Sequence, residues 1–99
     1  MTALAGGAWY KSAGGCSYIG LKDDVKYSYS WNLDFSSNGN ACVQGKGYKK
    51  VGQSSQEVWT GLGCGSGGSG AVSWGKVISV SQIKAQSITP LFGSKIRWN

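Results

Sequence analysis

The sequence predicts an all-β fold, a small antiparallel β-sandwich or barrel of about seven to eight short strands in a single domain over residues 1–99. Residues 25–35 alternate strictly between apolar and polar side chains, which is the pattern of a strand with one buried and one solvated face. Turn signals rich in Gly, Ser, Asn and Asp recur about every ten residues. No window shows the apolar period of an amphipathic helix.

Three strands are expected in the first part of the chain, at residues 8–12, 16–21 and 25–35. Gly14 and Gly15 separate the first two, and residues 22–24 form a turn before the third. The long third strand would bury the side of Val25 and Trp31 and turn its other side, which ends in Asp34, to water.

A hairpin is expected after the long strand, because Asn38-Gly39 is a strong signal for a tight turn into a strand at residues 41–50. A two-residue loop would place Lys46 opposite Trp31 on the buried face. A three-residue loop over residues 37–39, with Gly39 in the left-handed conformation, instead lays aromatic rings over glycines. That register pairs Phe35 with Ala41, Leu33 with Val43, Trp31 with Gly45 and Tyr29 with Gly47.

Four further strands are expected, at residues 56–62, 71–80, 81–88 and 95–98, with a turn at 51–55. The strand 71–80 would bury one face formed by Val72, Trp74, Ile78 and Val80. Residues 65–70, a run of Gly and Ser, are interpreted as a glycine-rich loop. The same composition is that of flexible segments that join chain ends in engineered or circularly permuted proteins, so both interpretations stay open.

Cys16, Cys42 and Cys64 allow one intramolecular disulfide in three pairings. The pairing Cys42–Cys64 is favoured because it closes the shorter loop between neighbouring elements, which leaves Cys16 free or available for a bond between chains. A disulfide indicates an oxidising compartment, and residues 3–5 have the Ala-x-Ala pattern that ends an export signal. The protein is therefore expected to be secreted.

The chain is basic, with ten Lys and Arg against four Asp and Glu and a net charge of +6. Such a charge favours encounters with anionic surfaces. The cations are scattered apart from one cluster, Lys46, Lys49 and Lys50, which surrounds Tyr48. These four residues are the predicted contact region, and Tyr10 and Trp59 are further candidates for an exposed aromatic platform.

Catalysis is not expected. The chain has no histidine, so mechanisms that rely on this general base are excluded. The four acids form no ordered set, and no C-x-x-C spacing indicates a metal site. Two glycine patterns around residues 65–76 match phosphate-binding motifs by letters alone, since no helix follows them. No cofactor is expected.

These observations favour a secreted, non-catalytic binding protein that acts on an extracellular target, as an antimicrobial or toxin-like protein or as an inhibitor of a secreted enzyme. Its partner would be an extracellular protein, a glycan or an anionic cell-surface polymer. An engineered or circularly permuted scaffold for protein–protein interaction is the alternative, and a small nucleic-acid-binding barrel is the third hypothesis. No apolar run is long enough for a transmembrane helix.

Overall fold

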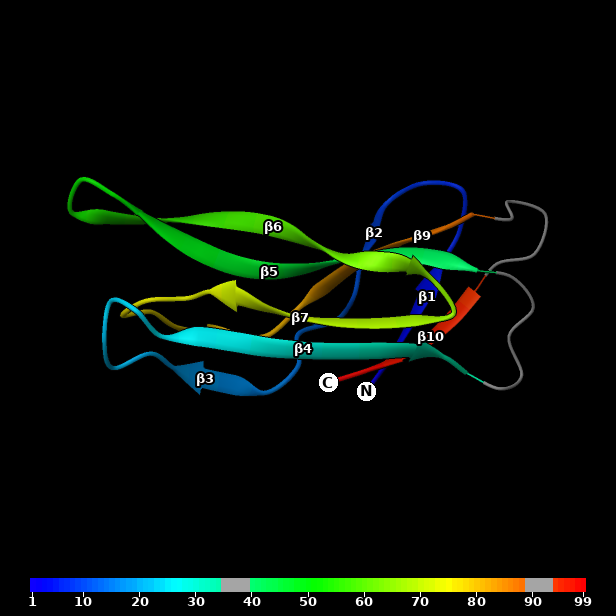
Figure 1. The fold of residues 1–99 in the computed structure, drawn as a ribbon, viewed down its shortest axis with the longest axis horizontal. Coiled ribbons are helices and arrows are strands. Elements are labelled where there is room, and N and C mark those ends of the chain that lie inside the picture. Colours follow the sequence, from blue (N-terminus) through cyan, green and yellow to red (C-terminus); the bar gives the residue numbers. More distant parts are fainter. Residues whose placement is uncertain (35–39, 89–93) are drawn as a thin grey trace.

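A computed structural model of the chain describes residues 1–34, 40–88 and 94–99. Within them the fold is an antiparallel β-sandwich, and no helix of a length and apolarity that could cross a membrane is found (Figure 1). Its strands are β1 (Thr2–Ala5), β2 (Tyr10–Lys11), β3 (Ser17–Ile19), β4 (Lys26–Leu33), β5 (Ala41–Val51), β6 (Ser54–Gly65), β7 (Gly67–Ser73), β8 (Ile78–Val80), β9 (Ile83–Ser87) and β10 (Ser94–Trp98).

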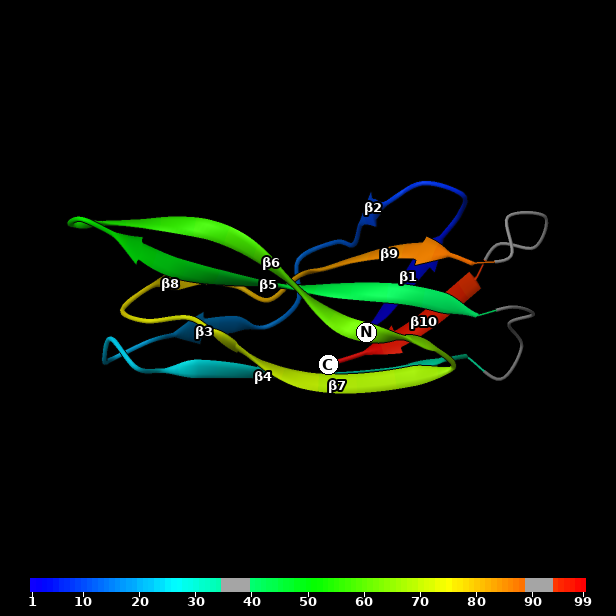
Figure 2. The ribbon, with the colours of Figure 1, turned by 45° about the horizontal axis from the view of Figure 1, so that its top comes forward.

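The two layers are four-stranded sheets with the orders β1-β10-β4-β7 and β2-β9-β5-β6. β3 and β8 form a separate two-stranded sheet. The molecule is elongated, with extents of 44 × 20 × 19 Å. Figures 1 and 2 show β3, β8 and the tip of the β5–β6 hairpin at one end, on the left of both views.

The predicted alternation of β4 is confirmed. Tyr29 and Trp31 are buried in the core, and Tyr27 and Leu33 pack against it. The polar side chains between them are exposed. Asp34 departs from the prediction because it is only 9% exposed. The Asp34 amide donates a hydrogen bond of 2.9 Å to the Lys95 carbonyl of β10, and Arg97 Nε, also on β10, lies 3.8 Å from the Asp34 carboxylate.

The predicted hairpin partner of β4 is wrong. β4 pairs with β7 and β10, whereas β5 pairs with β6 and β9. In the ladder, Trp31 lies opposite Gly68 and Tyr29 opposite Gly70. Rings over glycine were the physical basis of the predicted register, and glycines of β7 satisfy that preference instead. The Asn38-Gly39 loop, Gly39 and Phe35 lie outside the described residues.

Residues 65–70 are therefore not a loop. β6 ends at Gly65, only Ser66 lies between the strands, and β7 begins at Gly67. The loop prediction fails because glycine in a strand becomes favourable where an aromatic ring from the neighbouring strand covers it. The Trp31 indole illustrates this, since it covers Gly68 and its Nε1 donates a hydrogen bond of 3.0 Å to the Leu62 carbonyl.

The first strand, β1, was not expected from the sequence. Thr2–Ala5 pairs with β10 at the edge of the first sheet. Ala3 and Ala5 are buried in the core while Leu4 is exposed, so the segment is an ordinary amphipathic edge strand.

The single strand predicted at 71–80 is also wrong. Gly75 adopts a φ of 73°, which turns the chain between β7 and β8. The Trp74 indole stabilises this turn by donating a hydrogen bond of 2.8 Å to the Val77 carbonyl. Val72 and Trp74, before the turn, are buried as predicted, whereas Ile78 and Val80, after it, are 74% and 40% exposed instead of buried.

The disulfide prediction is confirmed, because Cys42 and Cys64 are bonded directly across the β5–β6 pair. The register of this pair shifts by one residue beside the bridge, where Gly63 adopts a φ of 98°. Cys16 is an exposed free thiol.

Tyr29 joins the two sheets at the centre of the core. Its hydroxyl donates a hydrogen bond of 2.7 Å to the Lys46 carbonyl and accepts one of 3.2 Å from the Gln82 amide. A Cβ added at Gly45 in the opposite sheet would lie 2.7 Å from the Tyr29 ring, so the ring rests on that glycine. Burial raises the pKa of Tyr29 from 10.0 to about 12.

We therefore expect Tyr29 to make the protein less stable in alkali. Between the two pKa values the unfolded chain releases the Tyr29 proton while the folded protein keeps it, so the free energy of unfolding falls as pH rises. The free energy of unfolding should therefore be lower by roughly 1 kcal/mol at pH 11 than at pH 9 through this residue. Urea unfolding between pH 9 and 11 should show this loss in the wild type relative to Tyr29→Phe, and parallel curves for the two proteins would contradict it.

Candidate functional site

The structure buries one of the four residues of the predicted contact region. Lys46 was expected to face a partner but is only 5% exposed. Its ammonium group donates a hydrogen bond of 3.5 Å to Ser79 Oγ on β8 and lies 5.9 Å from the centre of the Tyr48 ring. The prediction fails because β8, which is remote in sequence, brings Ser79 against this part of β5.

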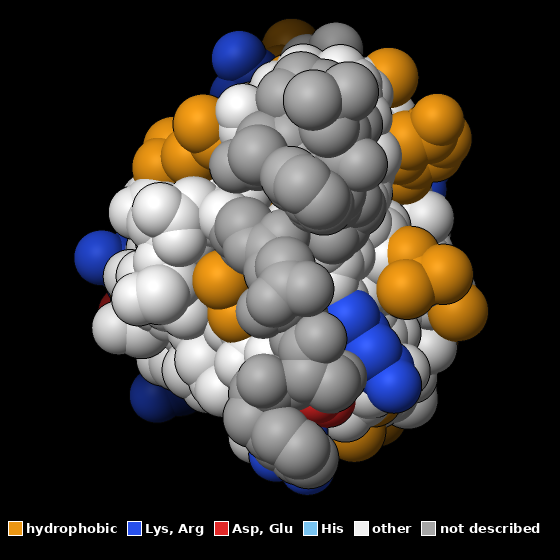
Figure 3. All heavy atoms as spheres, turned by 90° about the vertical axis from the view of Figure 1, so that its right-hand side faces the viewer, with side chains coloured by type: hydrophobic (Ala, Val, Ile, Leu, Met, Phe, Trp, Pro, Cys, Tyr) orange, Lys and Arg blue, Asp and Glu red, His pale blue; other side chains and the backbone are white. Residues whose placement is uncertain are grey.

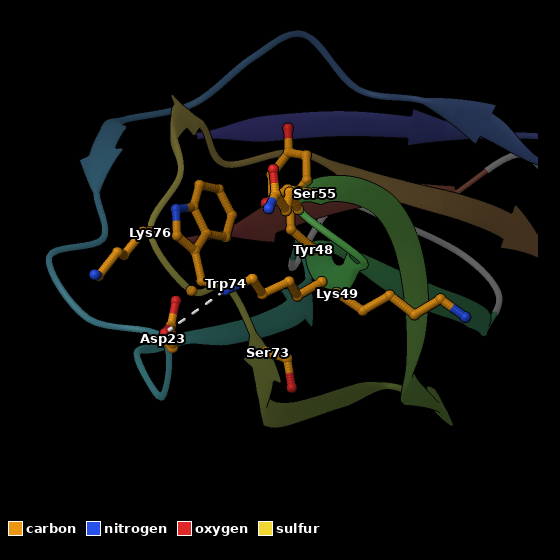
Figure 4. Close-up of a pocket in the computed structure, with 10 residues that line it drawn as sticks. Asp23, Tyr48, Lys49, Ser55, Ser73, Trp74 and Lys76 are labelled. Atoms are coloured by element: carbon orange, nitrogen blue, oxygen red, sulfur yellow. Dashed lines mark ion pairs between the residues drawn. The ribbon is translucent and has the colours of Figure 1, made fainter.

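Tyr48, Lys49 and Lys50 remain together and line a hollow of about 360 Å³ between the β5–β6 hairpin and the turn after β7. We call it the hairpin hollow, and its other lining residues include Asp23, Trp74 and Lys76 (Figure 4). The Tyr48 hydroxyl shares a hydrogen bond of 2.8 Å with Ser79 Oγ, and its ring meets the Trp74 ring edge to face at 5.1 Å. These contacts fix the aromatic wall of the hollow.

Part of the positive charge in the hairpin hollow is neutralised by Asp23, which also lines it. Lys50 Nζ lies 4.0 Å from the Asp23 carboxylate, and both side chains are more than 60% exposed (62% and 63%). The dashed line in Figure 4 marks this pair. An exposed pair at this distance contributes little to stability, yet it supplies a carboxylate that competes with any incoming anion.

A second cluster of lysines surrounds Trp59. Lys84 Nζ lies 4.4 Å from the centre of the Trp59 ring system and Lys11 Nζ lies 5.8 Å from it. These residues come from β9, β2 and β6, three strands of one sheet. Cation–π attraction therefore holds two ammonium groups over one half-buried indole.

The register explains why these side chains meet. Lys11 is the ladder partner of Lys84, Lys84 that of Gln44, and Gln44 that of Gly61. Directly paired residues project from the same face of a sheet, and Trp59 shares that face because it is two residues from Gly61. Ile83 and Ala85 on the opposite face are buried, so this row lies on the outer face of the sandwich.

The row borders a shallow hollow of about 390 Å³, whose lining includes Trp9, Gln44, Gly61 and the Cys42–Cys64 disulfide. Trp9 is 42% exposed, and a Cβ added at Gly61 would have no atom within 4 Å. The missing side chain at Gly61 therefore leaves open space in the hollow beside Trp9. We call the surface formed by Trp9, Lys11, Gln44, Trp59, Gly61 and Lys84 the Trp59 face.

The lysines of the Trp59 face differ from Lys50 in their partners. Among the described residues, Lys11 and Lys84 have no carboxylate within ion-pair distance. An aromatic ring attracts an ammonium group but leaves its N–H donors available. The site can therefore offer several charged donors to an anion beside an exposed indole that can pack against a flat apolar group.

Tyr10 does not join either cluster. It is the ladder partner of inward-facing Ala85, so it projects from the opposite side of β2 to Lys11. Tyr10 is 54% exposed and lines a separate hollow beside β1.

Sequence analysis identified Trp59 but missed Trp9, Lys11 and Lys84. The alternation of residues 83–87 places Lys84 opposite to Ile83 and Ala85, which is a usable signal for an outward lysine. Nothing in the sequence pairs β2 with β9, because these strands are more than 70 residues apart (Ile83 N to Ser12 Oγ spans 71 positions).

Comparisons of the chain with protein-family models, curated proteins and solved structures give no match, so the function is argued from the geometry of the site.

Proposed function

We propose that the protein is a secreted, non-catalytic binding protein that attaches to an anionic glycan polymer outside the cell through the Trp59 face. The observation that carries this proposal is the pair of ammonium groups held over Trp59 on an uncovered sheet face. The Cys42–Cys64 disulfide supports an oxidising, extracellular compartment.

The chemistry of an acidic sugar matches the groups on this surface. Its carboxylate or sulfate groups would accept hydrogen bonds from the Lys11 and Lys84 ammonium groups. Its ring carries apolar C–H groups that pack on an exposed indole such as Trp9, and the open space at Gly61 gives the ring room to approach. Contact with Trp59 already restricts both lysine side chains, which reduces the entropy lost on binding.

A charge-matched pair of variants tests the proposal. Lys11→Ser/Lys84→Ser removes two charges from the Trp59 face, and Lys49→Ser/Lys50→Ser removes two from the hairpin hollow. Binding to a sulfated polysaccharide, to a neutral polysaccharide and to duplex DNA should be measured at low and high salt. We expect affinity for the sulfated polymer to fall at least about tenfold in the first variant, as expected for the loss of charge-assisted hydrogen bonds, and less than about threefold in the second.

Equal losses in the two charge variants would show attraction by net charge alone and would contradict the site. Tighter binding to duplex DNA than to the sulfated polymer would favour the nucleic-acid hypothesis instead. Lys84 is half-buried, whereas Lys11, Lys49 and Lys50 are exposed. A urea unfolding curve of each variant therefore accompanies the binding measurements and should show both variants folded.

Gly61→Val tests the open space independently of charge. The backbone at Gly61 is outside the left-handed region and an added Cβ has no atom within 4 Å, so the fold should persist. We expect weaker binding to the sulfated polymer because the new side chain occupies part of the hollow beside Trp9. Ala71→Val, at an exposed position of the other sheet, is the matched control and should bind as the wild type does. Unchanged binding by Gly61→Val would remove the hollow from the site.

A further inference from the structure

The small β3–β8 sheet carries apolar side chains on its outer side. Ile19 and Ile78 are direct ladder partners, and Val80 projects from the same side of β8 as Ile78 by the two-residue period of a strand. Leu21 follows two residues after Ile19, just beyond the end of β3. These four side chains, Ile19, Leu21, Ile78 and Val80, are 56%, 77%, 74% and 40% exposed. We call them the apolar end face.

The orientation of this sheet is fixed by its inner side. Tyr18 meets the rings of Tyr27 and Trp74 edge to face, at 4.9 and 5.3 Å. Ser79, the ladder partner of Tyr18, bonds to the Tyr48 hydroxyl. Because Tyr18 and Ser79 are held inward, their strand neighbours Ile19, Ile78 and Val80 face water.

Lysines flank the apolar end face. Lys22 directly follows Leu21, and Lys76 lies two residues before Ile78; both are exposed. Lys49 and Lys50 border the hairpin hollow together with Lys76. Asp23 and Asp24 lie in the same turn as Lys22, and Asp23 is paired with Lys50. Counted over the turn at residues 22–24 and the hairpin hollow together, four lysines, Lys22, Lys49, Lys50 and Lys76, stand against the two aspartates.

We propose that this end of the elongated molecule docks on an anionic lipid surface, which goes beyond the glycan binding proposed above. Exposed aliphatic side chains would enter the boundary between headgroups and acyl chains, while Lys22 and Lys76 contact lipid phosphates. A patch of this kind on a soluble protein marks an interaction site. Figure 3 shows a different arrangement on the opposite end, where the visible hydrophobic side chains lie in several separate groups.

Charge selects the lipid surface over a second copy of the chain. A symmetric pair of copies would bring the same patch of each molecule together. Lys22 and Lys76 of one copy would then face the lysines that flank the same patch of the other, in molecules that each carry a net charge of +6. An anionic bilayer instead offers negative charge around an apolar interior.

Co-sedimentation with vesicles tests the proposal. One preparation is phosphatidylcholine alone, and the other contains equal parts of phosphatidylcholine and phosphatidylglycerol. The wild type should sediment with the mixed vesicles at physiological salt and at least about tenfold less with the neutral ones. Leu21→Ser/Ile78→Ser should weaken binding to the mixed vesicles at least about tenfold, because it removes the two most exposed side chains of the apolar end face.

The matched control is Leu4→Ser/Ile88→Ser, which changes the same residue types at positions 74% and 52% exposed on other elements. It should bind the mixed vesicles within about twofold of the wild type. Equal losses in the two double variants, equal binding to both kinds of vesicle, or no sedimentation at all would overturn the proposal. A dimer in sedimentation velocity that Leu21→Ser/Ile78→Ser abolishes would overturn it in favour of a second copy.

The glycan proposal and the lipid proposal can be contradicted independently of each other. Lys11→Ser/Lys84→Ser should bind the mixed vesicles as the wild type does, because the Trp59 face and the β3–β8 sheet are different surfaces and exposed charges are screened over about 8 Å at physiological salt. Leu21→Ser/Ile78→Ser should in turn keep its affinity for the sulfated polysaccharide. Loss of vesicle binding in the lysine variant would contradict the placement of the lipid site.

Discussion

Replacing Trp74 by alanine should lower the free energy of unfolding by about 3–5 kcal/mol, the usual cost of removing a buried tryptophan. Trp74 is 1% exposed, and its ring contacts Tyr18, Tyr27 and Tyr48 at centroid distances of 5.3, 5.5 and 5.1 Å. These tyrosines belong to β3, β4 and β5, which lie in three different sheets. The change therefore removes the side chain that joins the small sheet to the two layers of the sandwich.

Urea unfolding, followed by circular dichroism, measures this loss, and Trp9→Ala is the matched control. Trp9 is 42% exposed, so its replacement by alanine should lower the free energy of unfolding by less than about 1 kcal/mol. A domain of this length has a free energy of unfolding of roughly 5–15 kcal/mol. If that of the wild type lies near the lower end of this range, the Trp74→Ala variant should be only marginally folded. Similar costs for the two tryptophans would contradict the position of Trp74 in the core.

The local part of the fold could be predicted from the sequence. The alternation within β4 and the short strand β10 were predicted from neighbouring residues alone, and both are found in the structure. The disulfide was also predictable, since chain connectivity favours the shorter loop between Cys42 and Cys64. Predictions of this type succeed because they depend only on residues close in the sequence or on the length of the loop that a disulfide closes.

Strand partners could not be predicted, because several glycines compete for the same aromatic rings. Tyr29 has Gly70 beside it in the ladder and Gly45 beneath it in the opposite sheet. The rule that rings cover glycines holds for both, but it does not decide which glycine is a ladder partner and which packs across the sandwich. The Asn-Gly signal favoured β5 as the partner, whereas packing of both sheets favours β7.

The predicted and the observed candidate sites differ for the same reason, because strand partners remote in the sequence decide which side chains meet. Lys46, Lys49 and Lys50 are close in sequence, yet Lys46 is buried against Ser79. Lys11 and Lys84 are distant in sequence and meet over Trp59. In an antiparallel sandwich, charges gather across strands rather than along them, so clustering in the sequence is a poor guide to clustering on the surface.

The double change Cys42→Ala/Cys64→Ala should lower the free energy of unfolding by about 3 kcal/mol. The two cysteines are 22 residues apart, and the bridge limits the freedom of that loop in the unfolded chain. Cys64 is exposed and Cys42 half-buried, so lost packing adds little to this cost. Urea unfolding without reductant measures it, and mass spectrometry should show two hydrogens fewer in the wild type than in its reduced form.

Cys16→Ala is the control for the disulfide, because this thiol is exposed and unbonded, and its removal should change stability by less than about 0.5 kcal/mol. Equal stability of the oxidised wild type and the double variant would contradict a stabilising bridge. The bridge also lines the hollow of the Trp59 face and lies beside the bulge at Gly63. Because it fixes the spacing of β5 and β6 at that point, we expect the double variant to bind the sulfated polysaccharide more weakly even under conditions in which it is fully folded.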